Sequence, residues 1–186
     1  MNASLLKKRV DDILADPTKH EWTVQGFGFI RCYLDRDRVQ RLNIWDPTQA
    51  TDEVSTIHDH PWDFGSRIIY GTLHNQRFVN QPSGELYNFS LLKPGEGGHL
   101  IGTPGKMRLN AQPLETYNAG DTYSQTRKEL HESTPEPGCV TVITRQFHEQ
   151  DIATVCWRAG EWVSAEPRPA TLGEIAYFVS LVERTR

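Results

Sequence analysis

Residues 57–71 read IHDHPWDFGSRIIYG, and the predicted organisation of the chain follows from this stretch. His58 and His60 are two residues apart, so in a β-strand both imidazoles would project to the same side. Two ring nitrogens on one face of a strand make half of a metal site; the simplest alternative is a polar strand face in water. Residues 66–70 are mostly β-branched, aromatic or apolar and are followed by Gly71, which predicts a strand that ends in a turn.

A second stretch, residues 120–131, offers the rest of the site. It begins at Gly120, runs through polar residues and ends at His131, just before the β-rich run 139–147. We therefore expect His131 to complete a three-histidine metal site, with His74 as the alternative third ligand.

The two stretches together resemble the paired motifs of the cupin superfamily. The first cupin motif has His-x-His, usually followed by a Glu, and then a Gly, and the spacing from His60 to Gly71 fits it. The second runs from a Gly through a Pro-x-Gly turn to a His. Gly120 and His131 keep that separation, although the Pro and Gly of the turn are replaced. The resemblance implies a mainly β fold: a small antiparallel β-barrel, or jelly roll, with the metal inside and helices at the N- and C-termini.

The Glu of the first cupin motif is missing here, because Phe64 and Gly65 stand where it would be. A site of three neutral imidazoles is similar to that of the thiol dioxygenases, meaning cysteine dioxygenase and its mercaptopropionate and cysteamine relatives. This resemblance implies an iron-dependent dioxygenase that oxidises a small thiol with dioxygen to a sulfinic acid. The implied cofactor is Fe(II), with zinc and nickel as alternatives because imidazole binds all three metals.

Two other functions stay open at this point. One is a different metal-dependent cupin enzyme, either a dioxygenase that cleaves a carbon–carbon bond or a zinc or nickel isomerase or lyase. The other is a non-enzymatic cupin that binds a small molecule, because one fold hosts many activities.

The resemblance also suggests catalytic and substrate-binding residues. Thiol dioxygenases carry a Ser-x-His-x-Tyr set on the strand after the third His, and the corresponding positions here are Thr144, Gln146 and His148. These three alternate and would share one face, where His148 would act in catalysis and the other two would contact the substrate. Tyr70 and Tyr123 are further catalytic candidates.

A substrate carboxylate would need a cation, and a guanidinium meets a carboxylate with two hydrogen bonds. Arg31 is the nearest match to the arginine of the cysteine dioxygenases, and Arg67 and Arg41 are alternatives. Asp59 and Asp63 flank the histidine pair and are expected to hold a ligand imidazole by its second nitrogen.

Length, charge and cysteine content narrow the class of protein. The chain has 186 residues and a net charge of -4 at pH 7, which indicates one domain and no general attraction to nucleic acid or anionic membranes. No apolar run is long enough to cross a bilayer. Three cysteines are too few for a disulfide framework, so we expect buried thiols and a cytoplasmic location. The protein would act as a monomer or homodimer.

The chain is expected to form a single domain, residues 1–186, with a helix in 1–17, the barrel in 20–164 and a second helix in 170–185. An apolar stripe predicts the first helix over residues 3–15, and Thr171 with Glu174 forms a capping box for the second. Residues 93–118 resemble a cupin insertion that would help wall the pocket.

Further strands are expected before that insertion. Residues 39–45 alternate as a half-buried strand. Residues 72–80 and 85–92 are expected to form two strands that are joined by a turn at Gln81-Pro82-Ser83-Gly84.

Overall fold

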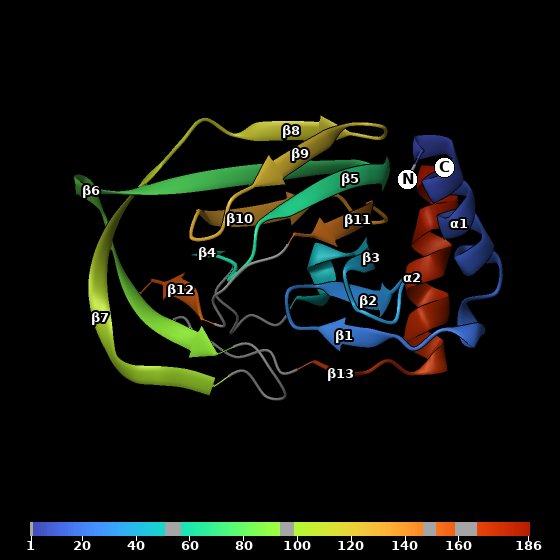
Figure 1. Cartoon of the computed structure of the whole chain (residues 1–186), viewed down its shortest axis with the longest axis horizontal. Helices are drawn as coiled ribbons and strands as arrows, with labels where there is room; N and C mark the ends of the chain where they lie inside the picture. Colours follow the sequence, from blue (N-terminus) through green and yellow to red (C-terminus); the bar gives the residue numbers. More distant parts are fainter. Residues whose placement is uncertain (1, 51–56, 94–98, 147–151, 159–166) are drawn as a thin grey trace.

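The computed structural model describes residues 2–50, 57–93, 99–146, 152–158 and 167–186. They form two antiparallel β-sheets, with both terminal helices at one end of the molecule (Figure 1). The prediction of a mainly β protein with a helix near each terminus is confirmed.

The first sheet carries the two helices on its outer face. The hydrophobic core between this sheet and the helices includes Val10 and Ile13 from the first helix and Phe178 and Val182 from the second. In spatial order the strands are β13 (Arg168–Pro169), β1 (Thr23–Gln25), β2 (Phe29–Tyr33), β3 (Gln40–Trp45), β11 (Val140–Arg145), β5 (Phe64–Tyr70) and β9 (Thr122–Gln125), and the helices are α1 (Ala3–Ala15) and α2 (Leu172–Thr185).

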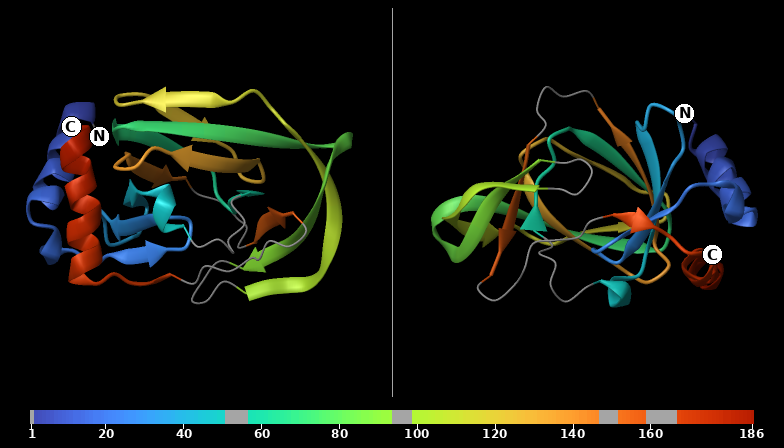
Figure 2. Two further views of the ribbon diagram at one scale, coloured as in Figure 1. Left: turned by 180° about the vertical axis from the view of Figure 1, so that it is seen from behind. Right: turned by 90° about the horizontal axis from the view of Figure 1, so that it is seen from below.

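The second sheet lies across the molecule from the helices. Its longest strand bends and curves together with its neighbour around the far end (left in Figure 1, right in the left panel of Figure 2). In order the strands are β10 (Leu130–Pro135), β4 (Ile57–His58), β12 (Ala153–Trp157), β6 (Thr72–Lys93) and β7 (His99–Ala111), and β8 (Glu115–Asn118) also pairs with β6.

Both predicted helices are confirmed. Asn2 caps α1, and its side chain accepts a hydrogen bond from the Ser4 backbone N–H. The Thr171 side chain and Glu174 form the complete capping box at the start of α2. Two short 3-10 turns, η1 (Pro17–Lys19) and η2 (Pro47–Gln49), follow α1 and β3.

The predicted turn at residues 81–84 is wrong. β6 runs without interruption from Thr72 to Lys93, and the pairing register with β7 shifts between Asn80 and Glu85. Asn80 and Glu85 both pair with Leu109, so residues 81–84 project out of the ladder, where a proline that donates no ladder hydrogen bond is tolerated.

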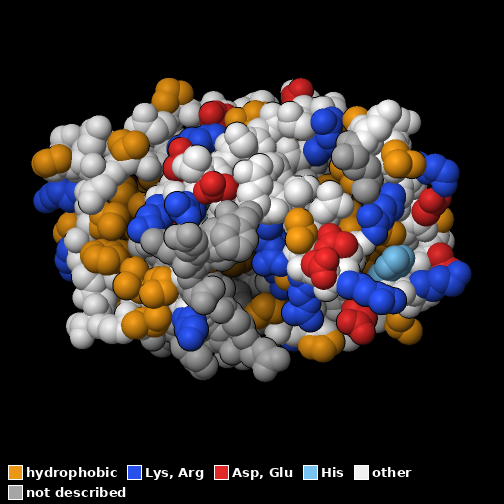
Figure 3. All heavy atoms as spheres, in the orientation of Figure 1, with side chains coloured by type: hydrophobic (Ala, Val, Ile, Leu, Met, Phe, Trp, Pro, Cys, Tyr) orange, Lys and Arg blue, Asp and Glu red, His pale blue; other side chains and the backbone are white. Residues whose placement is uncertain are grey.

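The predicted insertion is also more regular than expected. Its described part forms β7 and β8, which pair with β6 on the far side of the molecule. Apolar side chains gather over this end (left in Figure 3), and the exposed apolar residues of β6 and β7 include Leu86, Leu91 and Ile101.

β3 is buried on both faces, not half-buried as predicted. Leu42 and Ile44 belong to the core beneath the helices, and Arg41 and Trp45 face a cavity on the other side. The alternation of polar and apolar residues was real, but its polar face lines a cavity and not the solvent.

In the described part of the chain, neither helix combines the length and the apolarity needed to span a membrane.

Candidate metal centre

Three histidines from separate parts of the chain converge at the second sheet. β4 ends at His58, which lies directly opposite His131 of β10 in the antiparallel ladder. His60 follows in the loop after β4. One nitrogen from each of the three rings lies within 4.8 Å of the others. Among the described residues, this is the group of side chains that could hold a metal ion.

One local expectation about this site is wrong, because His60 does not belong to the strand. The Asp59 backbone N–H donates to the Thr154 carbonyl at 2.9 Å, and the regular pairing stops there. The ring of His60 is held by stacking on Trp62, with ring centroids 4.3 Å apart. The two rings of the His-x-His pair still meet, at a centroid distance of 4.8 Å.

The spacing of two of the donor atoms fits one metal ion. Nε2 of His60 and Nε2 of His131 are 3.2 Å apart. Two imidazole nitrogens bound to one ion at about 2.1 Å are about 3.0 to 3.4 Å apart at octahedral or tetrahedral angles. The His60 and His131 rings therefore already stand at the separation that a shared ion requires.

The surroundings keep the imidazoles of His60 and His131 neutral, which is the form that binds metals. Burial, reinforced by the neighbouring His58 and His131, lowers the pKa of His60 well below its ordinary value of 6.5. Burial followed by the effect of His58 lowers the pKa of His131 in the same way. Neither nitrogen needs to lose a proton from an imidazolium near neutral pH before it binds.

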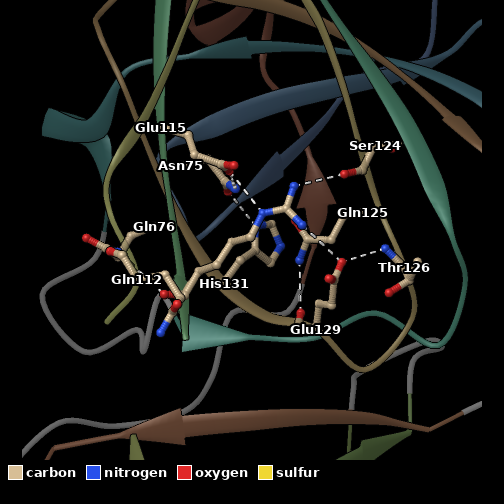
Figure 4. A network of polar contacts seen from close by, with 10 residues as sticks. Asn75, Gln76, Gln112, Glu115, Ser124, Gln125, Thr126, Glu129 and His131 are labelled. Carbon is tan, nitrogen blue, oxygen red and sulfur yellow. Dashed lines mark hydrogen bonds and ion pairs between the residues drawn. The ribbon is translucent and has the colours of Figure 1, made fainter. Parts of the chain in front are cut away.

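A buried amide holds the third histidine from behind. The side chain of Asn75, on β6, is fully buried, and its Oδ1 lies 2.9 Å from Nδ1 of His131 (Figure 4). Hydrogen bonding to the far nitrogen of a ligand imidazole orients the ring and fixes its tautomer.

The three rings lie at the wall of a cavity of about 210 Å³ between the two sheets. This volume is smaller than the roughly 300–1,000 Å³ of sites for drug-sized ligands, so the cavity suits a small molecule. Its walls are mostly apolar and include Phe27, Phe29, Trp45, Phe64 and Val155. The described residues from 93 to 118 do not line it, which corrects the expectation that this segment walls the pocket.

Two arginines bring positive charge into the same cavity. Arg31 and Arg41 both line it, and the Nε atom of each is buried with no hydrogen-bond partner in the structure. Burial, then the proximity of Arg31, lowers the pKa of Arg41 to about 9. The guanidinium of Arg41 lies 5.0 Å from the ring of Trp62, which in turn stacks on His60 of the three-histidine cluster.

Of the other predicted site residues, Arg31 and Tyr123 line the cavity. Burial raises the pKa of Tyr123 to about 12, so its phenol keeps its proton near neutral pH. Tyr70 instead points toward α1, where its hydroxyl donates to Asp11 at 2.5 Å. Arg67 donates to the Gly120 carbonyl at 3.1 Å and is not among the cavity-lining residues.

The structure describes only two of the three alternating residues predicted after the third histidine. Thr144 accepts a hydrogen bond from the Gln40 side chain at 3.3 Å and lies outside the cavity lining. Gln146 is exposed just beyond the end of β11. His148 lies outside the described residues.

The alternative ligand His74 lies away from the cluster. Its Nδ1 is 2.9 Å from the Thr116 hydroxyl, and its side chain is half-buried. Asp59 and Asp63 accept hydrogen bonds from the backbone N–H groups of Thr154 and Arg127, whereas the contact to a ring of the histidine cluster comes from Asn75.

Sequence reasoning missed Asn75 and gave Arg41 only as an alternative. A signal for Asn75 exists in the alternation of β6, since Leu73 and Asn75 share a face and Leu73 is buried. A polar residue on an inward face is a candidate for a buried hydrogen bond, but its partner is a residue distant in the sequence.

No protein-family model matches this chain, and no curated protein sequence matches it.

Proposed function

We propose that this protein is a mononuclear non-haem iron oxygenase that oxidises a small thiol with dioxygen to a sulfinic acid. The observation that carries the proposal is the convergence of His58, His60 and His131 at the wall of a small cavity between the sheets. We also propose that the two sheets form a barrel of the cupin type around this site, as the spacing of the histidine motifs implies.

The charge of the site supports a thiolate as the substrate group that approaches the metal. Three neutral imidazoles would leave a divalent ion its full charge, which favours an anionic substrate atom beside it. When bound, iron would supply the redox chemistry that lets dioxygen react with a thiol; both oxygen atoms end on sulfur, so no other reductant is needed.

The two cavity arginines support a second anionic group on the substrate. Arg31 and Arg41 each bury an Nε–H without an acceptor, and a buried donor without an acceptor is unfavourable. A substrate carboxylate would satisfy both groups and fix the substrate's orientation. The substrate class that fits best is therefore a small thiol that carries a carboxylate.

The remaining cavity residues would position the substrate and exclude water. The aromatic walls remove bulk solvent, which strengthens the attraction between the guanidinium groups and the carboxylate. The phenol of Tyr123 would remain a hydrogen-bond donor toward the substrate throughout the neutral pH range.

The test combines metal content with oxygen consumption. Protein loaded anaerobically with Fe(II) is expected to bind about one ion per chain and to consume oxygen when given carboxylate-bearing thiols such as cysteine or 3-mercaptopropionate. His131→Ala should abolish both properties. His74→Ala is the matched control, because it removes an imidazole outside the cluster and should leave both unchanged.

Three results would count against the proposal. Retention of iron by His131→Ala would remove the third ligand. Stoichiometric zinc or nickel with no oxygen consumption would favour an isomerase or lyase. Iron binding without turnover of any thiol would favour a small-molecule-binding protein.

A further inference from the structure

We propose that Asn75 and Glu115 are positioning residues that determine which ring nitrogen of His131 faces the metal. The proposal rests on the metal site of the proposed function, and it assigns a role to a polar network behind that site. The network extends from β10 through β6 to β8 (Figure 4).

The contacts between these residues are direct. Oδ1 of Asn75 lies 2.9 Å from Nδ1 of His131, and Nδ2 of the same amide donates to Glu115 Oε2 at 3.2 Å. Nε of Arg77 donates to that same Glu115 oxygen at 2.9 Å. A continuous path of hydrogen bonds thus connects a surface ion pair with a buried metal-site ring.

The direction of each hydrogen bond in this path is fixed. A carboxylate only accepts, so Glu115 must receive the amide N–H₂ of Asn75. The amide oxygen of Asn75 is then turned toward His131, where it can only accept. Nδ1 of His131 must therefore carry the proton, which leaves the lone pair on Nε2, the nitrogen beside His60.

The far end of the path is anchored strongly enough to hold this direction. Besides Glu115, the Arg77 guanidinium donates to Glu129 Oε2 at 3.2 Å and to the Ser124 carbonyl at 3.0 Å. Although burial raises the pKa of Glu115, the hydrogen bonds from Arg77 and Asn75 outweigh this effect and lower the pKa. Glu115 therefore stays an acceptor across the neutral range.

Removal of Glu115 should reverse the amide. Without that carboxylate, the strongest group beside Asn75 is the Arg77 guanidinium, which would attract the amide oxygen. The N–H₂ group would then face Nδ1 of His131 and favour the tautomer with the proton on Nε2. That tautomer cannot offer Nε2 to a metal without losing its proton.

The test is the tautomer of His131 in the metal-free protein, read from the ¹⁵N chemical shifts of its ring nitrogens. The parent is expected to carry the proton on Nδ1, and Glu115→Ala is expected to shift the population toward Nε2. Glu129→Ala is the matched control: it removes a carboxylate from the same arginine, which keeps its hydrogen bonds to Glu115 and to the Ser124 carbonyl, so the tautomer should stay unchanged.

A rescue variant separates this role from a general loss of structure. Asn75→Asp added to Glu115→Ala supplies a side chain that accepts from both His131 and Arg77, so the Nδ1–H tautomer should return. Affinity for Co²⁺ should follow the tautomer: about 10-fold weaker in Glu115→Ala, as for other residues that support metal ligands, and largely restored in the double variant.

The outcomes distinguish the two proposals. An unchanged tautomer in Glu115→Ala, in a protein that still binds Co²⁺ through His131, would overturn the positioning role and leave the metal site intact. A tautomer that shifts and is rescued as expected, in a parent that binds no metal, would support the network and overturn the proposed function. Loss of the tautomer in Glu129→Ala to the same extent would also contradict the role of Glu115.

Discussion

At the scale of single residues, Arg41 is a side chain that would favour ligand binding and lower the stability of the ligand-free fold. Its Nε is buried in the cavity wall without a hydrogen-bond partner, close to the second cation Arg31. Such a group is unfavourable in the folded protein unless a ligand supplies the acceptor.

Arg41→Met should therefore have opposite effects on stability and on binding. We expect the free energy of unfolding to rise by about 1 kcal/mol, because an incompletely paired cation leaves the interior. Affinity for a small carboxylate should fall by at least about 10-fold, since a charge-assisted hydrogen bond contributes about 1.5–3 kcal/mol. Chemical denaturation and calorimetric titration with 3-mercaptopropionate measure the two effects.

Arg67→Met is the control and also tests the prediction that Arg67 binds substrate. Because Arg67 donates to the Gly120 carbonyl and does not line the cavity, we expect carboxylate affinity to stay within about twofold. A large loss of affinity in Arg67→Met, with none in Arg41→Met, would contradict the assignment of the anion-binding arginines.

The sequence predicted the three-histidine cluster better than its surroundings. His58, His60 and His131 could be found because a two-residue spacing and a Gly-to-His separation are visible along the chain. Asn75 could not be found in this way, since its role depends on pairing between β6, β8 and β10, which sequence spacing does not reveal.

At the scale of single elements, the turn between β5 and β6 connects the two sheets. Its conformation depends on a glycine. Gly71 has φ +74°, and a Cβ placed there would lie 3.0 Å from the Cys139 Cα. We expect Gly71→Ala to lower the free energy of unfolding by about 2 kcal/mol, through backbone strain and this contact.

Gly65 provides the matched comparison for that substitution. A Cβ at Gly65 would meet nothing within 4 Å, and its φ is in the ordinary range. Gly65→Ala should change stability by less than about 1 kcal/mol, as measured in the same denaturant series. Equal losses in both variants would contradict the strain argument.

The capping box of α2 should make the free energy of unfolding depend on pH in the acid range. Hydrogen bonding by Arg168, then by the Thr171 backbone, lowers the pKa of Glu174 to about 2, below its ordinary 4.5. A carboxyl whose pKa is lowered by folding stabilises the protein above its unfolded pKa and loses that effect as pH falls. The loss should therefore occur between about pH 4.5 and 2.

Glu174→Gln tests this dependence, because the amide does not titrate. The difference in melting temperature between parent and variant should shrink as the pH falls through that window. A difference that stays constant from neutral pH to pH 2 would show that the Glu174 charge does not contribute.

Elements with strong local signals were predicted well, and the others were not. The apolar stripe and the caps of α1 and α2 are local properties, so both helices could be predicted. The continuous β6 could not, because Gln81-Pro82-Ser83-Gly84 has the composition of a turn. The strand continues past this sequence because the residues on either side, up to Asn80 and from Glu85, pair with β7, which is a tertiary effect.

Metal binding should stabilise the whole molecule, because the three ligands come from β4, the loop after it and β10, which are brought together only by folding. At a free metal concentration 100 times the dissociation constant, the free energy of unfolding should rise by about 2.7 kcal/mol. For a chain of this length, the melting temperature should then increase by roughly 5–10 °C.

Thermal denaturation with and without metal measures this stabilisation. His131→Ala should lose the increase, and His74→Ala should retain it. A comparable increase in both variants would indicate that the metal binds elsewhere on the folded protein.

The most direct test of the account is the number of histidine ligands at the metal, measured by X-ray absorption of protein loaded anaerobically with Fe(II). The account predicts a first shell of three imidazoles with the remaining positions filled by light atoms, reduced to two imidazoles or to loss of iron in His131→Ala. A shell of oxygen ligands without imidazole, or one unchanged by His131→Ala, would contradict it.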